Sequence, residues 1–186
     1  MPADLDHAPR SGLGAPSPWV RRWAHLVPAE STVLDLAAGG GRHTRFFHER
    51  GNRVIALDRD LRGMADLAGV AGIELAECDL EMGRWPLDGR RFGAVVVTQY
   101  LHRPLLPVLA QSIEPTGTLI YETFAVGQAE FGRPSNPDFL LKPGELLDAF
   151  TPALQIIAYE HGIVYAPRPA AVQRMAAVRD STLRAL

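Results

Sequence analysis

The stretch Val33–Phe47, VLDLAAGGGRHTRFF, decides how the rest of the chain is interpreted. A short apolar run is broken by Asp35, three glycines follow, and the residues after them can open a helix. Glycine at such a junction indicates that the backbone bends sharply or passes very close to another group. In a sheet of parallel strands, a glycine-rich turn after the first strand marks a ligand site at the carboxyl ends of the strands.

Segments that suit strands alternate along the chain with segments that suit short helices. This alternation is typical of a mostly parallel sheet with helices on both faces. The last two apolar segments are joined only by APRP (166–169), which is too short for a crossover helix, so they should pair antiparallel. The sequence predicts an α/β fold, a doubly wound, mostly parallel seven-stranded sheet with a C-terminal antiparallel hairpin. The predicted strands are Val33–Ala37, Arg53–Asp58, Ile73–Leu80, Phe92–Gln99, 117–124, 154–165 and 170–178, and the predicted helices include 17–27, Leu61–Leu67, 104–113 and one that begins near Pro143.

Two common nucleotide-binding turns do not fit the glycine run. A P-loop requires a Gly-Lys-Ser/Thr sequence, and no lysine lies near this turn. A dinucleotide fingerprint, Gly-x-Gly-x-x-Gly, would place Ala37, Gly39 and Arg42 at its three glycine positions. Two of these positions fail, which disfavours a nucleotide-dependent oxidoreductase without removing it as an alternative.

The stretch LDLAAGGG instead resembles the first motif of class I S-adenosylmethionine-dependent methyltransferases, an acid followed by Gly-x-Gly-x-Gly. Asp35 matches the acid, Gly39 and Gly41 match the second and third glycines, and Ala37 replaces the first, which crowds the turn slightly. The resemblance implies a Rossmann-like fold with S-adenosyl-L-methionine as cofactor. It also implies that Asp35 meets the cofactor's ammonium, directly or through water, while backbone N–H groups of the turn meet its carboxylate. A plain structural turn that ends a buried strand is the alternative.

Further residues at strand ends extend the resemblance. Asp58 ends the second predicted strand, where the family binds the ribose hydroxyls, and Asp79 ends the third, where the family binds the adenine amino group. The resemblance implies that the backbone N–H of Leu80 meets the adenine ring, which Arg59 and Leu80 enclose from either side. Gln99, at the end of the fourth strand, is assigned to the same cofactor site. Any one of these acids is compatible with an ordinary strand-end carboxylate, whereas their succession favours a cofactor site.

The fourth strand delivers TQYLHRP (98–104) beside the transferred methyl group. Tyr100 and His102 are the candidate catalytic residues, and Arg103 is a candidate substrate contact. His102 is either a general base, because an imidazole titrates near neutrality, or a surface histidine that opens a helix. Tyr100 either contributes to the chemistry or forms a wall of the cofactor pocket.

Three further substrate contacts are expected around the same edge: Trp19, Glu122 and Phe131. Glu122 lies at the end of the fifth strand and either touches substrate or ties down a loop. The segment 125–142 has no clear periodicity and is long for a connection in a compact domain. We expect it to cover the substrate as a lid, with a packed connection as the alternative.

Methyl transfer from a sulfonium is a direct displacement and requires no metal. Cys78 is the only cysteine, which excludes an internal disulfide framework and a cysteine-rich metal cluster. His43 and His48 are poorly spaced for two ligands on one helix face, and with Arg45 they are predicted to lie on the helix surface. The sequence therefore predicts no metal site.

Within the superfamily, TQYLHRPLL (98–106) and the stretch 121–147 look most like the small tellurite-resistance and thiopurine methyltransferases. The resemblance implies a methyltransferase that acts on a small molecule or a metalloid. A non-catalytic partner subunit that binds S-adenosylmethionine is an alternative. The substrate, the methylated atom and the oligomeric state stay open.

Length and composition are compatible with this assignment. The 186 residues suit one domain, which we place at 17–186 after a disordered tail at 1–16 rich in Pro, Gly and Ala. A net charge of −2 makes nucleic acid an unexpected partner. The sequence shows neither a signal-peptide core nor an apolar run long enough for a bilayer, so we expect a cytoplasmic protein without membrane contact.

Overall fold

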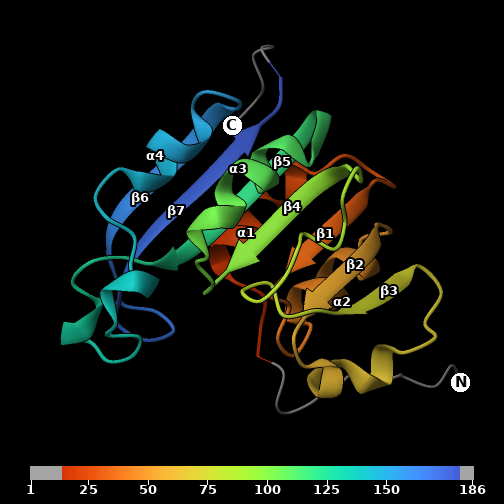
Figure 1. Ribbon diagram of the computed structural model, residues 1–186, viewed down its shortest axis with the longest axis horizontal. Helices are drawn as coiled ribbons and strands as arrows, with labels where there is room; N and C mark the ends of the chain where they lie inside the picture. Colours follow the sequence, from red (N-terminus) through yellow and green to blue (C-terminus); the bar gives the residue numbers. More distant parts are fainter. Residues whose placement is uncertain (1–13, 181–186) are drawn as a thin grey trace, which may run out of the picture.

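A seven-stranded sheet forms the centre of the computed structural model, which describes residues 14–180 (Figure 1). Its strands follow the order β3-β2-β1-β4-β5-β7-β6. Six strands run in the same direction, and β7 runs in the opposite one. This confirms the predicted doubly wound sheet and its antiparallel hairpin. Most of the tail predicted at 1–16 lies outside the described residues. The strands are β1 Thr32–Leu36, β2 Arg53–Asp58, β3 Ile73–Glu77, β4 Phe92–Thr98, β5 Ile113–Phe124, β6 Gln155–Val164 and β7 Ala170–Val178.

Helices cover both faces of the sheet (Figure 1). Ser17 caps the first of them, because its side chain accepts a hydrogen bond from the backbone N–H of Trp19 at 3.1 Å. The α-helices are α1 Pro18–Trp23, α2 Arg42–Glu49, α3 Leu106–Gln111 and α4 Glu145–Phe150, and the 3-10 helices are η1 Ala24–Leu26, η2 Leu61–Leu67, η3 Arg103–Leu105, η4 Gln128–Glu130 and η5 Pro137–Phe139.

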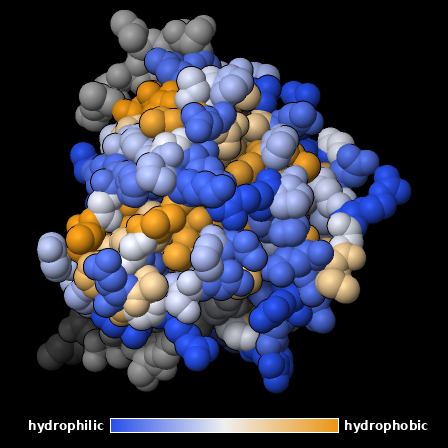
Figure 2. Space-filling view, turned by 60° about the vertical axis from the view of Figure 1, so that its left-hand side comes forward, coloured by the Kyte–Doolittle hydropathy of each residue, from blue (hydrophilic) through white to orange (hydrophobic). Residues whose placement is uncertain are grey.

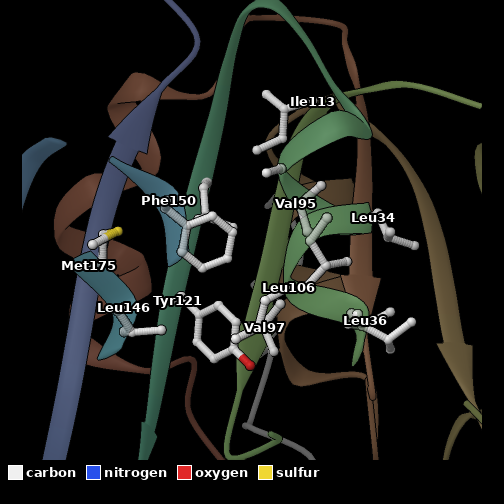
Figure 3. Close-up of a cluster of buried hydrophobic side chains, with 14 of the residues drawn as sticks. Leu34, Leu36, Val95, Val97, Leu106, Ile113, Tyr121, Leu146, Phe150 and Met175 are labelled. Carbon is white, nitrogen blue, oxygen red and sulfur yellow. The ribbon is translucent and has the colours of Figure 1, made fainter. Parts of the chain in front are cut away.

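The central strand β4 shows why the layers form. Successive side chains of a strand point to opposite faces, so a run that is apolar throughout must be covered on both sides. Val95 and Val97 enter the core cluster that contains residues of α3 and α4, whereas Ala94 and Val96 enter the cluster that contains α1. Figure 3 shows Val95 and Val97 beside Leu106. Burial of each such side chain contributes about 1.5–3 kcal/mol, so the sheet holds its strand ends in place firmly.

Two strand boundaries differ from the predictions by more than one residue. β3 ends at Glu77, so Asp79 and Leu80 follow the strand, because the Asp79 carboxylate accepts a hydrogen bond from the Glu81 backbone N–H at 2.9 Å and closes a turn. β5 begins at Ile113, earlier than predicted, since a shift in its register with β4 accommodates the extra residues.

One edge of the sheet collects the segments that matter for function. The arrowheads of β1, β2 and β4 point to the same side in Figure 1, where the loop after β2 and the segment 125–142 also lie. No helix among residues 14–180 is both long and apolar enough to cross a bilayer.

Candidate functional site

The glycine turn after β1 is a left-handed stretch of backbone. Ala37, Gly39 and Gly41 have φ values of 53°, 58° and 75°, a region that glycine enters without steric cost. At Gly41 a side chain is excluded for a second reason, because a Cβ atom would lie 2.8 Å from Cγ of Met64. Ala37 holds the same backbone conformation with a side chain, so its φ value stores strain at this turn.

Asp58 closes the mouth of the turn. One of its carboxylate oxygens accepts the backbone N–H of Gly39 at 2.7 Å, and the other accepts that of Asp60 at 3.1 Å. A carboxylate offers about four lone-pair sites, so further donors can still be accepted. The contact joins the ends of β1 and β2 and keeps the half-buried carboxylate beside the exposed Gly39.

Asp35 lies behind the turn and is buried. Its carboxylate accepts a hydrogen bond from the Thr44 hydroxyl at 2.6 Å, which fastens the first turns of α2 to the end of β1. Burial raises the pKa of Asp35 from 3.8 to about 6, against the opposing effect of the Thr44 hydrogen bonds. A carboxylate that is 2% exposed favours the water-mediated form of the expected ammonium contact over the direct one.

The expected adenine contacts lie beyond β2 and β3. Asp79 and Arg59 are exposed, whereas the side chain of Leu80 packs into the core cluster beneath α3 and α4. The enclosure of an adenine ring between Arg59 and Leu80 stays a prediction.

A cavity of about 250 Å³ lies where the segments that follow β3, β4 and β5 meet. From one side it is lined by Glu81, Gln99, Tyr100 and Leu101, which follow β3 and β4. From the other it is lined by Thr123, Phe124, Pro134 and Phe139, which belong to β5 and the segment after it. The topology thus brings Gln99 and Tyr100 into the lining of one cavity.

Tyr100 lines this cavity with its aromatic ring. Its hydroxyl is inaccessible to solvent and has no hydrogen-bond partner among the described residues. Burial, reinforced by the negative charges of Glu81 and Asp79, raises the pKa of Tyr100, so the phenol stays protonated. Gln99 precedes it with a φ of 55°, a second strained residue at a strand end.

Trp19 does not reach the site, contrary to the expectation that it touches substrate. Its indole is 1% exposed and donates a hydrogen bond from Nε1 to the Met175 carbonyl at 3.1 Å. The guanidinium carbon of Arg174 lies 4.7 Å from the centre of the ring. Trp19 therefore serves packing and fixes α1 on the sheet.

Arg103 also has a structural role in place of the expected substrate contact. It forms an ion pair with Glu145 at 2.6 Å and donates to the carbonyls of Asp138 and Leu140 at 2.6 and 2.9 Å. These contacts clamp the end of the segment 125–142 against the start of α4.

Glu122 ties down the start of the N-terminal helix α1, whereas the sequence predicted that it touches substrate or ties down a loop. Its carboxylate accepts the Ser17 hydroxyl at 2.7 Å and pairs with Arg174 at 3.3 Å. The backbone N–H of Ser17 in turn donates to Nε2 of His43 at 3.1 Å.

The prediction that His43 lies on the helix surface is wrong. His43 is 2% exposed, and burial together with the charge of Arg42 lowers its pKa from 6.5 to about 3. The neutral ring is required because Nε2 must accept the Ser17 N–H. Sequence reasoning missed His43 and Thr44 because nothing in their spacing indicates which way α2 faces.

The segment 125–142 is anchored along its length. The backbones of Ala125 and Leu141 pair in a parallel bridge, and Gln128 is buried and accepts a hydrogen bond from the Ala171 backbone N–H at 3.0 Å. Phe139 lines the cavity, whereas Phe131, the residue singled out from the sequence, is outside its lining. His102 is likewise outside the lining and precedes η3.

Exposed apolar side chains gather on the side of the sheet that holds this segment. Val126, Phe131, Phe139 and Ile163 are the large ones that belong to it. Figure 2 brings this side of the molecule forward and shows apolar groups separated by hydrophilic residues. Residues 14–180 contain no group of three or more His, Cys, Asp or Glu residues that could hold a metal ion.

No protein-family model and no curated protein matches the sequence, but many solved structures match the fold. TehB from Haemophilus influenzae aligns with a TM-score of 0.70 at 17% identity over 86% of this chain, which spans 61% of that protein. The 1,6-didemethyltoxoflavin-N1-methyltransferase of Burkholderia thailandensis, with bound 1,6-didemethyltoxoflavin and S-adenosylhomocysteine, aligns with a TM-score of 0.67 at 20% identity over 88% of this chain and 77% of its own. An S-adenosylmethionine-dependent methyltransferase from Mesorhizobium loti aligns with a TM-score of 0.65 at 18% identity over 86% of this chain and 96% of its own. The chain has the fold of the class I S-adenosylmethionine-dependent methyltransferases.

Proposed function

We propose that this protein is an S-adenosylmethionine-dependent methyltransferase that acts on a small molecule. The observation that carries the proposal is the Asp58 carboxylate held at the mouth of a left-handed glycine turn, 2.7 Å from the Gly39 nitrogen. The bound S-adenosylhomocysteine of the Burkholderia enzyme supports the choice of cofactor.

The residues of this edge fit the parts of such a cofactor. Asp58 uses two of its acceptor sites on backbone N–H groups and keeps others for the ribose hydroxyls. Asp79 is exposed and can accept the adenine amino group, and the N-terminal end of α2 favours a carboxylate. Ala37, Gly41 and Gln99 complete the proposed cofactor site through their positions at the ends of β1 and β4.

The bound cofactor supplies an activated methyl group on a sulfonium. The protein then has to align a nucleophile with that methyl group and exclude water, and we assign this task to the cavity beside Tyr100. The phenol of Tyr100 stays protonated and His102 is outside the cavity lining, so the wall holds neither a phenolate nor an imidazole, and Glu81 is its one carboxylate. We therefore expect a substrate atom that is nucleophilic without first losing a proton, such as an amine nitrogen or a sulfur.

Titration calorimetry with four ligands tests the cofactor. We expect S-adenosylmethionine and S-adenosylhomocysteine to bind and NAD and ATP to show no comparable affinity. Tight NAD binding without binding of the methyl donor would revive the oxidoreductase alternative. Methyl donor binding without turnover on any amine, thiol or metalloid would favour the non-catalytic partner subunit.

A further inference from the structure

We propose that the cavity beside Tyr100 binds a small, uncharged or cationic molecule with a flat ring, and that it rejects oxyanions. This inference rests on the proposed methyltransferase function and names the substrate class of the same site. It decides between the two substrate classes that the sequence leaves open, a small organic molecule and a metalloid oxyanion.

The shape of the cavity supports a small ligand with a flat ring. Tyr100, Phe124 and Phe139 contribute three aromatic rings to its wall, and Pro134 adds a rigid apolar surface. Aromatic walls favour flat rings, which they contact by stacking and edge-to-face packing. A volume of about 250 Å³ is below the roughly 300–1,000 Å³ of sites for drug-sized ligands, so the ligand is small.

The charge of the cavity wall supports the rejection of oxyanions. Glu81 is the only lining residue with a charge at neutral pH, and none of the Lys, Arg or His residues between 14 and 180 lines the cavity. The charges that act on Tyr100 are the carboxylates of Glu81, Asp79 and Asp58 against one cation, Arg59, so negative charge predominates at this wall. An anion would have to give up its hydration beside a carboxylate with no cation to replace the water.

Glu81 has a second consequence for the reaction. When a neutral nitrogen attacks the methyl carbon, its lone pair forms the new bond, the carbon–sulfur bond breaks and its electron pair stays on sulfur. The positive charge moves from the sulfonium to the nitrogen, which releases any surplus proton to solvent. A carboxylate at the cavity wall stabilises this developing cation.

Three pyridines of similar size test the selectivity: 4-methylpyridine, 4-(aminomethyl)pyridine and pyridine-4-carboxylate. Binding is measured by ligand-observed NMR with saturating S-adenosylhomocysteine, at mildly alkaline pH where the ring nitrogen is unprotonated. We expect the neutral and cationic pyridines to bind about tenfold more tightly than the carboxylate, and sodium tellurite not to displace them.

Variants assign the selectivity to named residues. Glu81→Gln should remove most of the preference for the aminomethyl over the carboxylate compound, whereas Glu77→Gln, an exposed carboxylate on β3 outside the cavity, should not. Phe139→Ala should weaken all three pyridines by about tenfold, the effect of removing one aromatic wall.

Equal or tighter binding of the carboxylate or of tellurite by the wild-type protein would overturn the inference, and so would failure of every pyridine to bind. Calorimetry on the same samples keeps the two proposals distinct. If S-adenosylhomocysteine binds and the anion preference is reversed, only the substrate class is wrong. If S-adenosylhomocysteine does not bind, the proposed function itself fails.

Discussion

Replacement of Asp35 by asparagine should make the protein more stable at neutral pH. The wild-type carboxylate is 2% exposed, and burial raises its pKa from 3.8 to about 6. At about 1.4 kcal/mol per pH unit, this difference means that the ionised carboxylate costs the folded state about 3 kcal/mol above pH ~6. The asparagine side chain would be uncharged, nearly the same shape, and still able to accept the Thr44 hydroxyl that now donates at 2.6 Å.

The sign of the pH dependence follows from proton binding. Between pH ~4 and ~6 the folded protein holds a proton on Asp35 that the unfolded chain has lost, so the free energy of unfolding falls as pH rises through this window. His43 has the opposite effect in an overlapping range, because its pKa is lowered from 6.5 to about 3 and its contribution is lost as pH falls. Only the difference between Asp35→Asn and wild type isolates Asp35.

Urea unfolding of both proteins from pH ~4 to pH ~8 measures that difference. We expect it to be near zero at the acid end and to grow to as much as about 3 kcal/mol in favour of Asp35→Asn above pH ~6. Thr44→Val is the matched control: it removes the partner while the carboxylate stays, so it should destabilise by about 1–3 kcal/mol at neutral pH and less in acid. A difference between wild type and Asp35→Asn that does not vary with pH would refute the reasoning.

Four other outcomes are expected. Asp58→Ala should weaken S-adenosylhomocysteine binding by about 1–3 kcal/mol in calorimetry, and Asp60→Ala should not; a loss for Asp58→Ala of only a few tenths, with the fold intact, would mean that the ribose lies elsewhere. Ala37→Gly should raise the free energy of unfolding by up to about 1 kcal/mol, because a φ of 53° strains alanine and not glycine; a lower stability in urea would contradict this. Phe139→Ala should lower kcat/KM about tenfold with an unchanged cofactor Kd, and Phe131→Ala, outside the cavity lining, should change neither; equal effects of the two would argue against a wall formed by Phe139. Methyl transfer should continue in the presence of EDTA. Loss of activity in EDTA that one divalent ion restores would contradict this prediction.

The sheet, its antiparallel hairpin and the glycine turn could all be predicted from the amino-acid sequence, because each depends on local chemistry. An apolar run such as Phe92–Thr98 must be covered on both faces wherever it lies, and the left-handed φ values at Gly39 and Gly41 are open to few residues other than glycine. The carboxyl ends of parallel strands meet at one edge, so the order of the elements is enough to place Asp58 beside the turn.

The tertiary structure decides which side chains at that edge line a cavity and which form packing contacts instead. Ser17 and Glu122 are 105 residues apart and still share a hydrogen bond, and His43 is buried because α2 turns it toward Ser17. Partners of this kind depend on how the helices sit on the sheet, which no local pattern records. Arg103 and Trp19 therefore belong to the framework, and Phe139, through its position after β5, belongs to the cavity wall.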